Sequence, residues 1–324
     1  MKNGGCIMKR VLLFLTFTTL MFGTALGQLK KLYFTPQWIP QTQFAGYYVA
    51  KEKGFFKEVG LNVIFRHLKT ETKQTPITFL QSNETQIITT HFLQALEAVD
   101  NGCKLVNILQ TSQNNALMCV SSKKIRSIKE LSGKNIGTWK VGFKEVAELA
   151  FMENDVKVNW IPFLNGVNLF VYKAVDATLC YSYSEFIRLY MIKGEIPEEN
   201  KVYFSKIGYN YPEDGVYVTE SFYNTHKTDL RKFAAAAKKG WDYARAHKEE
   251  AIKITQKYMK QCNVSLSNMH LQMMLDEVLR LQEDEATREV TYAPISPEVF
   301  KKVNEKLRKA GIIKHNIKYE EMFK

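Results

Sequence analysis

The chain has 324 residues, of which 45% are hydrophobic and 24% are charged, and its formal net charge is +12. That length is enough for two lobes, each with a hydrophobic core of its own. The basic residues are interspersed with acidic ones, so the charge indicates a solvated basic surface and gives no support to nucleic acid binding.

The start of the chain has the pattern of a secretion signal. Lys9 and Arg10 precede an apolar run at 11–22, and residues 25–27 read Ala-Leu-Gly, which is a small-x-small cleavage site. A membrane anchor is the alternative, but the run is shorter than the ~20 residues that a span needs. We therefore expect an exported, periplasmic protein whose mature chain begins at Gln28.

Four cysteines lie beyond that segment: Cys103, Cys119, Cys180 and Cys262. No two of them form a C-x-x-C pair, so the sequence does not indicate a zinc or thioredoxin-type site. An exported protein can hold disulfides. A bond between Cys103 and Cys119 and a set of four free thiols are both compatible with the sequence.

Short apolar segments alternate with amphipathic ones through the first part of the mature chain. Strands are expected at 29–34, 61–68, 86–90, 104–109 and 116–121. Helices are expected at 43–57, 73–82 and 92–101. This alternation predicts a mostly parallel sheet that helices cover on both faces.

A second unit is expected to begin near residue 123 and to repeat the same alternation. Its strands are expected at 135–138, 158–161 and 174–179, with a helix at 143–153. The last third is helical, and Trp241 lies on the apolar face of the segment 229–245. The predicted boundaries place 28–121 and 217–324 in lobe 1 and 122–216 in lobe 2.

Residues 37–60 read QWIPQTQFAGYYVAKEKGFFKEVG, a Trp-Pro loop followed by a helix that starts with small residues and two tyrosines. With 127–139, 174–188 and 229–252, this stretch resembles the periplasmic solute-binding proteins of ABC transporters, in the branch related to thiamine-pyrimidine precursor proteins. The resemblance covers nearly all of the mature chain. It implies an α/β, bilobal type II periplasmic binding protein fold, with two parallel-rich sheets flanked by helices and a ligand cleft between the lobes.

The resemblance also implies what the protein does and with which partners. It implies a monomer without a cofactor that closes on a small-molecule ligand and delivers it to an ABC permease in the inner membrane. A thiamine pyrimidine precursor is the first candidate ligand, and a flavin or a sulfonate, taurine or nitrate ion are alternatives. An exported sensor that presents its ligand to a membrane receptor needs the same cleft, so this role stays open.

Aromatic residues at the first strand end are candidates for holding a planar ring. Trp38 lies on a loop that Pro40 stiffens, and a ring stacked on it gains about 0.5–1.5 kcal/mol beyond burial. In the related branch the tryptophan of this motif stacks on the ligand. Tyr47 and Tyr48 are adjacent in a helix and face different ways, so at most one lines the cleft, and we expect Tyr47. Gly46 is expected to let this helix approach the ligand closely.

A second polar and aromatic loop follows the strand expected at 174–179. Tyr181, Tyr183 and Glu185 match the positions from which the resembling proteins carry a tyrosine and a glutamate into the cleft. A carboxylate accepts hydrogen bonds from an aminopyrimidine with about 1.5–3 kcal/mol. The alternative for Glu185 is a charge that favours a helix N-terminus.

Three further residues are candidates. Trp139 precedes a helix start whose backbone N–H groups can hold an acceptor oxygen. His91 ends a strand and is either a cleft hydrogen bonder or a structural histidine. Asp214 lies in a loop near the return to lobe 1, where it reaches the ligand or caps a turn.

The sequence does not indicate an enzyme or a metal site. A eukaryotic relative makes the thiamine pyrimidine from its own lysine-bound pyridoxal phosphate and a histidine. Thr90 and Gln94 occupy the positions of that lysine and histidine here, and no cysteine cluster appears near 205–220. No P-loop, G-x-S-x-G, Rossmann or H-E-x-x-H motif is present. A pyrimidine-synthesis enzyme is therefore the least favoured alternative.

Overall fold

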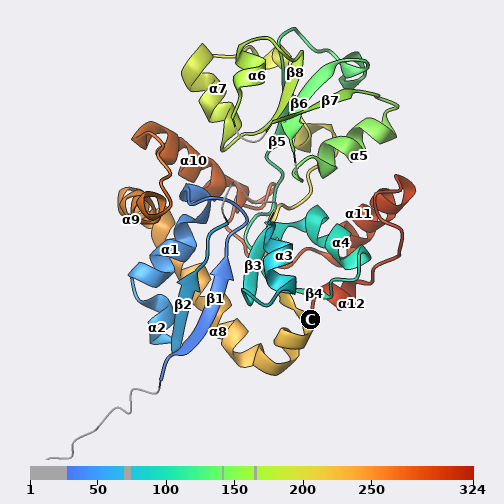
Figure 1. Ribbon diagram of the computed structural model, residues 1–324. Helices are drawn as coiled ribbons and strands as arrows, with labels where there is room; N and C mark the ends of the chain where they lie inside the picture. Colours follow the sequence, from blue (N-terminus) through green and yellow to red (C-terminus); the bar gives the residue numbers. More distant parts are fainter. Residues whose placement is uncertain (1–27, 69–73, 141, 164–165) are drawn as a thin grey trace, which may run out of the picture.

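The computed structural model describes residues 28–68, 74–140, 142–163 and 166–324. The expected signal segment lies outside these residues. Within them the chain forms two lobes, with the smaller one uppermost in Figure 1 and both chain-crossing segments between them. No helix in the described ranges is both long and apolar enough to cross a membrane.

The sheet of lobe 1 has the strand order β2-β1-β3-β10-β4. Its strands are β1 (Lys30–Thr35), β2 (Leu61–Phe65), β3 (Ile87–His91), β4 (Leu105–Gln110) and β10 (Asp214–Thr219). β1 pairs in parallel with β2 and β3, whereas β10 runs antiparallel to both β3 and β4. The core of this sheet is made by buried aliphatic and aromatic side chains, as the apolar strand segments predict.

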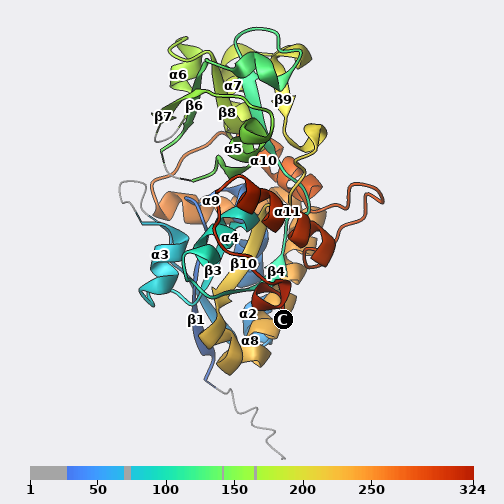
Figure 2. The same cartoon turned by 90° about the vertical axis from the view of Figure 1, so that its right-hand side faces the viewer.

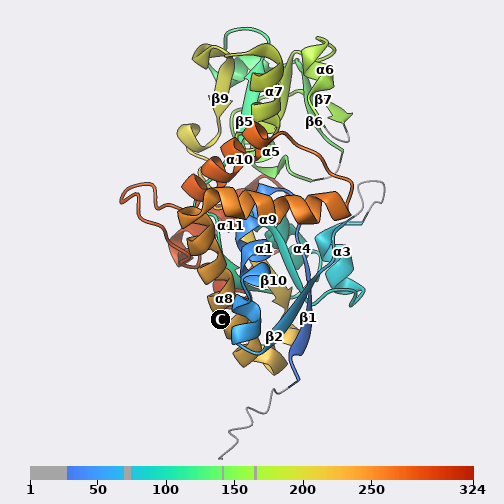
Figure 3. The same ribbon diagram turned by 90° about the vertical axis from the view of Figure 1, so that its left-hand side faces the viewer.

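The helices of lobe 1 pack around this sheet, as Figures 2 and 3 show from two sides. They are η1 (Thr42–Phe44), α1 (Ala45–Glu52), α2 (Phe55–Glu58), α3 (Pro76–Gln81), α4 (Phe92–Asp100), α8 (Glu220–Ala246), α9 (Lys248–Gln261), α10 (Asn268–Leu281), α11 (Pro297–Lys309) and α12 (Tyr319–Met322). The helix expected at 43–57 is divided because Gly54 adopts a left-handed conformation, with φ of 81°. Trp241 on α8 is 1% exposed and belongs to the core, as expected.

The sheet of lobe 2 has the order β7-β6-β8-β5-β9. Its strands are β5 (Leu117–Ser121), β6 (Asn135–Trp139), β7 (Asn159–Phe163), β8 (Ala177–Tyr181) and β9 (Lys201–Tyr203). Its helices are η2 (Ile128–Leu131), α5 (Glu145–Glu153), α6 (Asn168–Val171), α7 (Glu185–Lys193), η3 (Glu198–Asn200) and η4 (Ser205–Ile207). β6 pairs in parallel with β7 and β8, and β5 runs antiparallel to β8 and β9.

Each lobe therefore takes its one antiparallel strand directly after the chain arrives from the other lobe. The predicted boundaries differ from this arrangement, because they put all of β5 in lobe 1 and residues 214–216 of β10 in lobe 2. Both strands are apolar runs that suit either sheet, so their hydrophobic pattern does not show which sheet they join. The crossings lie at 111–116 and near 212–213.

The four cysteines in the described part of the chain are free thiols. Cys103, Cys119 and Cys180 are buried, and Cys262 is exposed. Burial raises the pKa of Cys119 to about 12. The bond between Cys103 and Cys119 that the sequence left open is absent from the described residues, and the buried thiols act as small apolar side chains.

Candidate ligand-binding cleft

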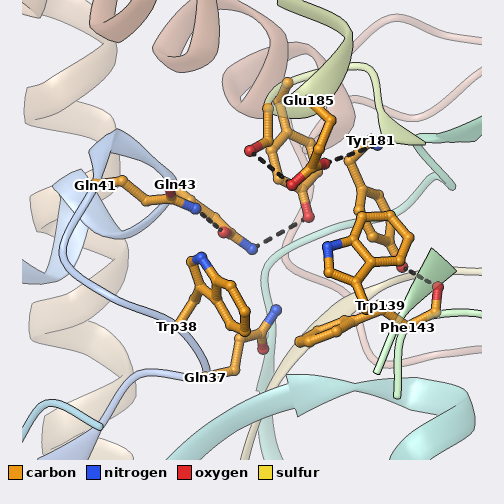
Figure 4. A pocket seen from close by; sticks show the side chains of 10 residues that line it. Gln37, Trp38, Gln41, Gln43, Trp139, Phe143, Tyr181 and Glu185 are labelled. Carbon is orange, nitrogen blue, oxygen red and sulfur yellow. Dashed lines mark hydrogen bonds between the residues drawn. The ribbon is translucent and has the colours of Figure 1, made fainter. Parts of the chain in front are cut away.

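A cavity lies between the lobes, next to the carboxyl ends of β1, β6 and β8 (Figure 4). It holds about 300 Å³ of empty space, including its opening to solvent. Its walls are Gln37, Trp38, Gln41 and Gln43 of lobe 1 and Trp139, Phe143, Tyr181, Tyr183, Ser184 and Glu185 of lobe 2.

The loop after β1 carries the lobe 1 wall. The backbone N–H of Gln37 donates to Thr89 Oγ1 at 2.9 Å, which ties the loop to β3. Trp38 follows and is only partly buried, so its indole is presented to the cavity, as Figure 4 shows. Trp38 lies in the loop directly after the end of β1. Pro40 restricts the backbone of that loop, which helps to hold the indole ring in this position.

Aromatic rings dominate the lobe 2 wall. The centroid of the Trp139 ring lies 5.2 Å from that of Tyr181, and the Tyr181 ring stacks on Tyr183 at 5.3 Å with 22° between the planes. Such offset contacts hold each ring in place. The cavity therefore has indole rings on both lobes and a phenol stack on one side.

Phe143 joins the two walls. Its ring belongs to lobe 2, yet its centroid lies 5.5 Å from Trp38 and 5.3 Å from His91, which are both in lobe 1. Its backbone has φ of 67°, a conformation that costs a bulky residue on the order of 1–3 kcal/mol. The strained turn thus brings an aromatic ring across the boundary between the lobes.

Glutamines provide the polar edge of the cavity. Gln37 Nε2 donates to Asp214 Oδ1 at 2.8 Å, and Gln41 Nε2 donates to Gln43 Oε1 at 2.7 Å. Gln37 Oε1 is buried and has no hydrogen-bond partner in the part of the chain that the structure describes. An unpaired buried acceptor costs about 1–3 kcal/mol, so this oxygen is suited to accept from a ligand N–H.

Glu185 begins α7 and is 4% exposed. Its Oε2 accepts from the backbone N–H of Tyr181 at 3.2 Å, and its Oε1 accepts from Ser184 Oγ at 3.4 Å. Burial raises the pKa of Glu185 above its ordinary value, although the backbone N–H groups of Glu185 and Tyr181 oppose the shift.

A group of three ionisable residues lies behind the cleft. His91 Nε2 is 3.1 Å from Asp214 Oδ1, and its Nδ1 is 3.3 Å from the Tyr181 hydroxyl oxygen. Burial disfavours the charged imidazole, but Asp214, Glu213 and Glu145 together raise the pKa of His91. His91, Glu213 and Asp214 are close enough to hold a cation.

The fit of a cation to this group is poor, because the oxygens already have partners. Asp214 accepts from the side-chain amides of Gln37 and Gln43, and Glu213 Oε1 accepts from the backbone N–H of Ala116 at 2.7 Å. These hydrogen bonds fix the position of Gln37 and Gln43, whereas His91 Nε2 is buried without a hydrogen-bond partner among the described residues.

Glu213 makes the stability of the protein depend on pH. Burial raises its pKa to about 8, against about 4.3 in an unfolded chain. The contribution of Glu213 to the free energy of unfolding is therefore complete below about pH 4.3. This contribution is lost as the pH rises towards 8, at up to about 1.4 kcal/mol per pH unit. The raised pKa of His91 acts in the same direction.

We expect the variant Glu213→Gln to lose much of the fall in Tm between pH 5 and pH 8, because its neutral amide keeps an acceptor for Ala116. Calorimetric scans at several pH values measure this, with the exposed Glu249→Gln as the matched control. A wild-type slope retained in Glu213→Gln would contradict the assignment.

The structure brings most of the predicted ligand residues together. Five of them line the cavity: Trp38, Trp139, Tyr181, Tyr183 and Glu185. Asp214 holds the glutamines in place and lines a neighbouring cavity. His91 lies between Tyr181 and Asp214 and lines neither cavity. Contact of these residues with a solute remains a prediction.

The expectation for Tyr47 differs from its place in the structure. Tyr47 is 1% exposed, and its ring packs against Phe34 and Trp241 rather than lining either cavity. Gly46 allows the close approach of the Trp241 ring rather than of a ligand, because a Cβ at Gly46 would lie 2.2 Å from this indole ring. The small residues of α1 therefore allow tight packing against α8.

Sequence reasoning missed five residues of the cavity: Gln37, Gln41, Gln43, Phe143 and Ser184. The glutamines follow a strand end beside Trp38, and that position was a usable signal for a polar contact. No local pattern indicates Phe143, because its place depends on an unusual backbone conformation.

Comparisons with known proteins agree with this architecture. Residues 41–251 match the family described as NMT1/THI5 like. The riboflavin-binding protein RibY of Chloroflexus aurantiacus is 25% identical over 297 residues, which cover 88% of this chain and 82% of that protein.

Solved structures share the fold at low identity. The aliphatic sulphonate binding protein SsuA of Escherichia coli has a TM-score of 0.64 at 11% identity, over 90% of this chain and 96% of that one. A zinc-bound ligand binding component of an ABC-type import system from Staphylococcus aureus has a TM-score of 0.65 at 9% identity, over 91% and 96%. These likenesses concern the fold alone. The chain belongs to the NMT1/THI5-like family and has the bilobal fold of these binding proteins.

Proposed function

We propose that this protein binds a small planar nitrogen heterocycle in the cleft and delivers it to an ABC permease in the inner membrane. The observation that carries the proposal is an aromatic cavity lined by Gln37, whose buried Oε1 has no hydrogen-bond partner among the described residues. A flat ring between Trp38 and the lobe 2 aromatics would bury both faces, and its N–H groups would bond Gln37 and Glu185. Ligand contacts to both lobes would favour the closed arrangement.

The charges around the cleft disfavour an oxyanion. None of the residues that line this cavity or the neighbouring one is a lysine or an arginine. A sulfonate, taurine or nitrate ion would instead meet Glu185 or the nearby Asp214, and the lining offers no lysine or arginine to bind it. A neutral or weakly basic ring avoids this cost.

Two ring systems fit the proposal. A thiamine pyrimidine precursor suits the aromatic lining of this cavity and the motif at 37–60. A flavin is the second candidate because RibY, which is named for riboflavin binding, is a relative over most of the chain. A flavin ring with its side arm would extend beyond this cavity.

A thermal-shift series tests the proposal. The purified protein is heated with aminopyrimidines, riboflavin, taurine, alkanesulfonates and nitrate in turn. A ligand at 100 times its Kd stabilises by about 2.7 kcal/mol, which gives a shift of several degrees. We expect the rings to stabilise the protein, and a shift with oxyanions alone would contradict the proposal.

A variant of Glu185 tests whether the ligand ring forms a hydrogen bond with this carboxylate. Replacing it with glutamine keeps the shape and removes the negative charge, so we expect an aminopyrimidine to bind about ten-fold more weakly, or ~1.4 kcal/mol. Titration calorimetry measures the change. The matched control is Glu195→Gln, an exposed residue just beyond α7. Equal affinity in both variants would mean that the ligand does not contact this carboxylate.

A further inference from the structure

His91 lies at the boundary between the lobes and contacts both of them. It is the last residue of β3 in lobe 1, where it pairs with Asp214 of β10, and it is 6% exposed. Its ring packs against two aromatic rings of lobe 2, with centroids 5.3 Å from Phe143 and 5.4 Å from Tyr181. An imidazole in this place joins groups on the two sides of the cleft.

A chain of hydrogen bonds runs from this imidazole to the strained turn of lobe 2. The Tyr181 hydroxyl donates to the carbonyl oxygen of Phe143 at 3.2 Å, which Figure 4 marks with a dashed line. A hydroxyl has one proton to donate, and burial raises the pKa of Tyr181 well above its usual range, so that this proton stays on the oxygen. The hydroxyl oxygen is therefore the acceptor in its 3.3 Å contact with His91 Nδ1, and Nδ1 must carry a proton.

The other imidazole nitrogen faces a carboxylate. His91 Nε2 is 3.1 Å from Asp214 Oδ1 but makes no hydrogen bond among the described residues, so the contact depends on charge. A lone pair on Nε2 is repelled at this distance, whereas a protonated nitrogen is attracted. Burial lowers the pKa of the imidazole, but Asp214, Glu213 and Glu145 together raise it above its ordinary value. The contacts therefore fit an imidazolium ion with a proton on both nitrogens.

A neutral His91 cannot make both contacts. With its proton on Nδ1, the bare Nε2 meets the Asp214 carboxylate. With its proton on Nε2, the bare Nδ1 accepts from the Tyr181 hydroxyl, and the Phe143 carbonyl oxygen loses its donor. That oxygen belongs to the turn in which Phe143 has φ of 67°, a conformation that persists only where surrounding contacts hold it. Loss of the proton thus weakens the contact with lobe 1 or releases the turn of lobe 2.

We propose that protonated His91 is a positioning residue that latches the Phe143 turn of lobe 2 to lobe 1, so that closure of the cleft depends on pH. The latch is the chain from His91 through Tyr181 to the Phe143 carbonyl. The Phe143 ring lines the cleft and contacts Trp38, so the latch acts on the ligand site without touching the ligand. Closure is favoured below the pKa of His91 and weakens as the pH rises through it. The inference concerns the lobes themselves and holds whatever solute the cleft binds.

Nuclear magnetic resonance of the ligand-free protein tests for the proton. Two-bond correlations between imidazole protons and nitrogens distinguish the imidazolium ion from each neutral tautomer, and the resonances of His91 are those missing from His91→Asn. At about pH 7 we expect both nitrogens of His91 to be protonated. His67 is the internal reference, because burial lowers its pKa to about 4 and it stays neutral. A neutral His91 at that pH would overturn the proposal.

Hydrogen exchange, corrected for the effect of pH on the intrinsic rate, tests the latch. The peptide 142–148 should lose about five-fold in protection between about pH 6 and about pH 9, and the peptide 250–260 of α9 should not change. In His91→Asn the side-chain amide keeps a donor for Tyr181 and does not titrate, so the protection of the turn should be independent of pH. Constant protection in the wild type, or the same loss in the variant, would contradict the latch. His91→Gln serves if His91→Asn does not fold.

Ligand affinity measures the effect on the site. Riboflavin and 4-amino-5-hydroxymethyl-2-methylpyrimidine are the probes, and the ratio of the wild-type Kd to the His91→Asn Kd at each pH cancels the titration of the probe. We expect this ratio to rise about five-fold between about pH 6 and about pH 9. The matched control is His67→Asn, which lines neither cavity and should give a constant ratio. A constant ratio with His91→Asn would overturn the role of His91 in binding.

Glu213 is the group that needs to be separated from His91, because its pKa of about 8 lies in the same range. In Glu213→Gln one negative charge beside the imidazole is lost, so the pH dependence should move to lower pH and persist. Its disappearance would assign the dependence to Glu213 and overturn the proposal. If neither probe binds, the proposed function fails, whereas the resonance and exchange experiments still decide whether the latch exists.

Discussion

Replacing Trp38 with alanine is expected to weaken binding of the ring ligand about ten- to a hundred-fold, or ~1.4–2.8 kcal/mol. The indole is the only ring on the lobe 1 wall of the cavity as the structure describes it, so its loss leaves one face of the ligand without a stacking partner. Trp38 is partly exposed and its ring contacts Phe143, so the fold should keep most of its stability. Titration calorimetry gives the Kd, and a thermal scan checks the fold.

Trp160 provides a matched control for this experiment. It is also a partly buried tryptophan, but it lies on β7 of lobe 2 and stacks on Phe151 at 5.6 Å, away from the cavity lining. Trp160→Ala should lower the Tm and leave the Kd unchanged. If the two variants bound the ligand equally well, Trp38 would not be a stacking residue.

Replacing Gly240 with alanine is expected to destabilise the protein by about 3 kcal/mol, because α8 and α1 touch at this point. A Cβ at Gly240 would lie 2.1 Å from the carbonyl oxygen of Gly46 and 2.9 Å from the backbone nitrogen of Ala50. These are backbone atoms that cannot rotate away, so the helices must separate. Chemical denaturation measures the loss.

The sign of this effect makes the prediction specific. In an isolated helix, alanine is favoured over glycine by about 1 kcal/mol. The variant Ala235→Gly, at an exposed position of the same helix, measures this difference in helix propensity alone. It should lower the free energy of unfolding by about this amount and no more. A Gly240→Ala variant as stable as the wild type would contradict the close packing of α1 on α8.

Residue patterns predicted the site better where it lies at strand ends than where it depends on a helix. Trp38, Tyr181 and Glu185 follow apolar strands, and parallel sheets bring such ends together, so their place in the cleft was predictable. Tyr47 was not, because a helix residue faces the cleft or the core according to what packs against it. Trp241, nearly two hundred residues later in the chain, decides that Tyr47 faces the core.

The sequence by itself determined the two α/β units, the core stripe of α8 and the aromatic strand ends, since each depends on local periodicity and composition. Only the tertiary structure decided that β5 and β10 each complete the sheet of the lobe they enter. It also decided the positive φ of Phe143, the network that aligns Gln37 and Gln43, and the contacts of His91 with both lobes. These features depend on contacts between residues far apart in the chain, which no local pattern records.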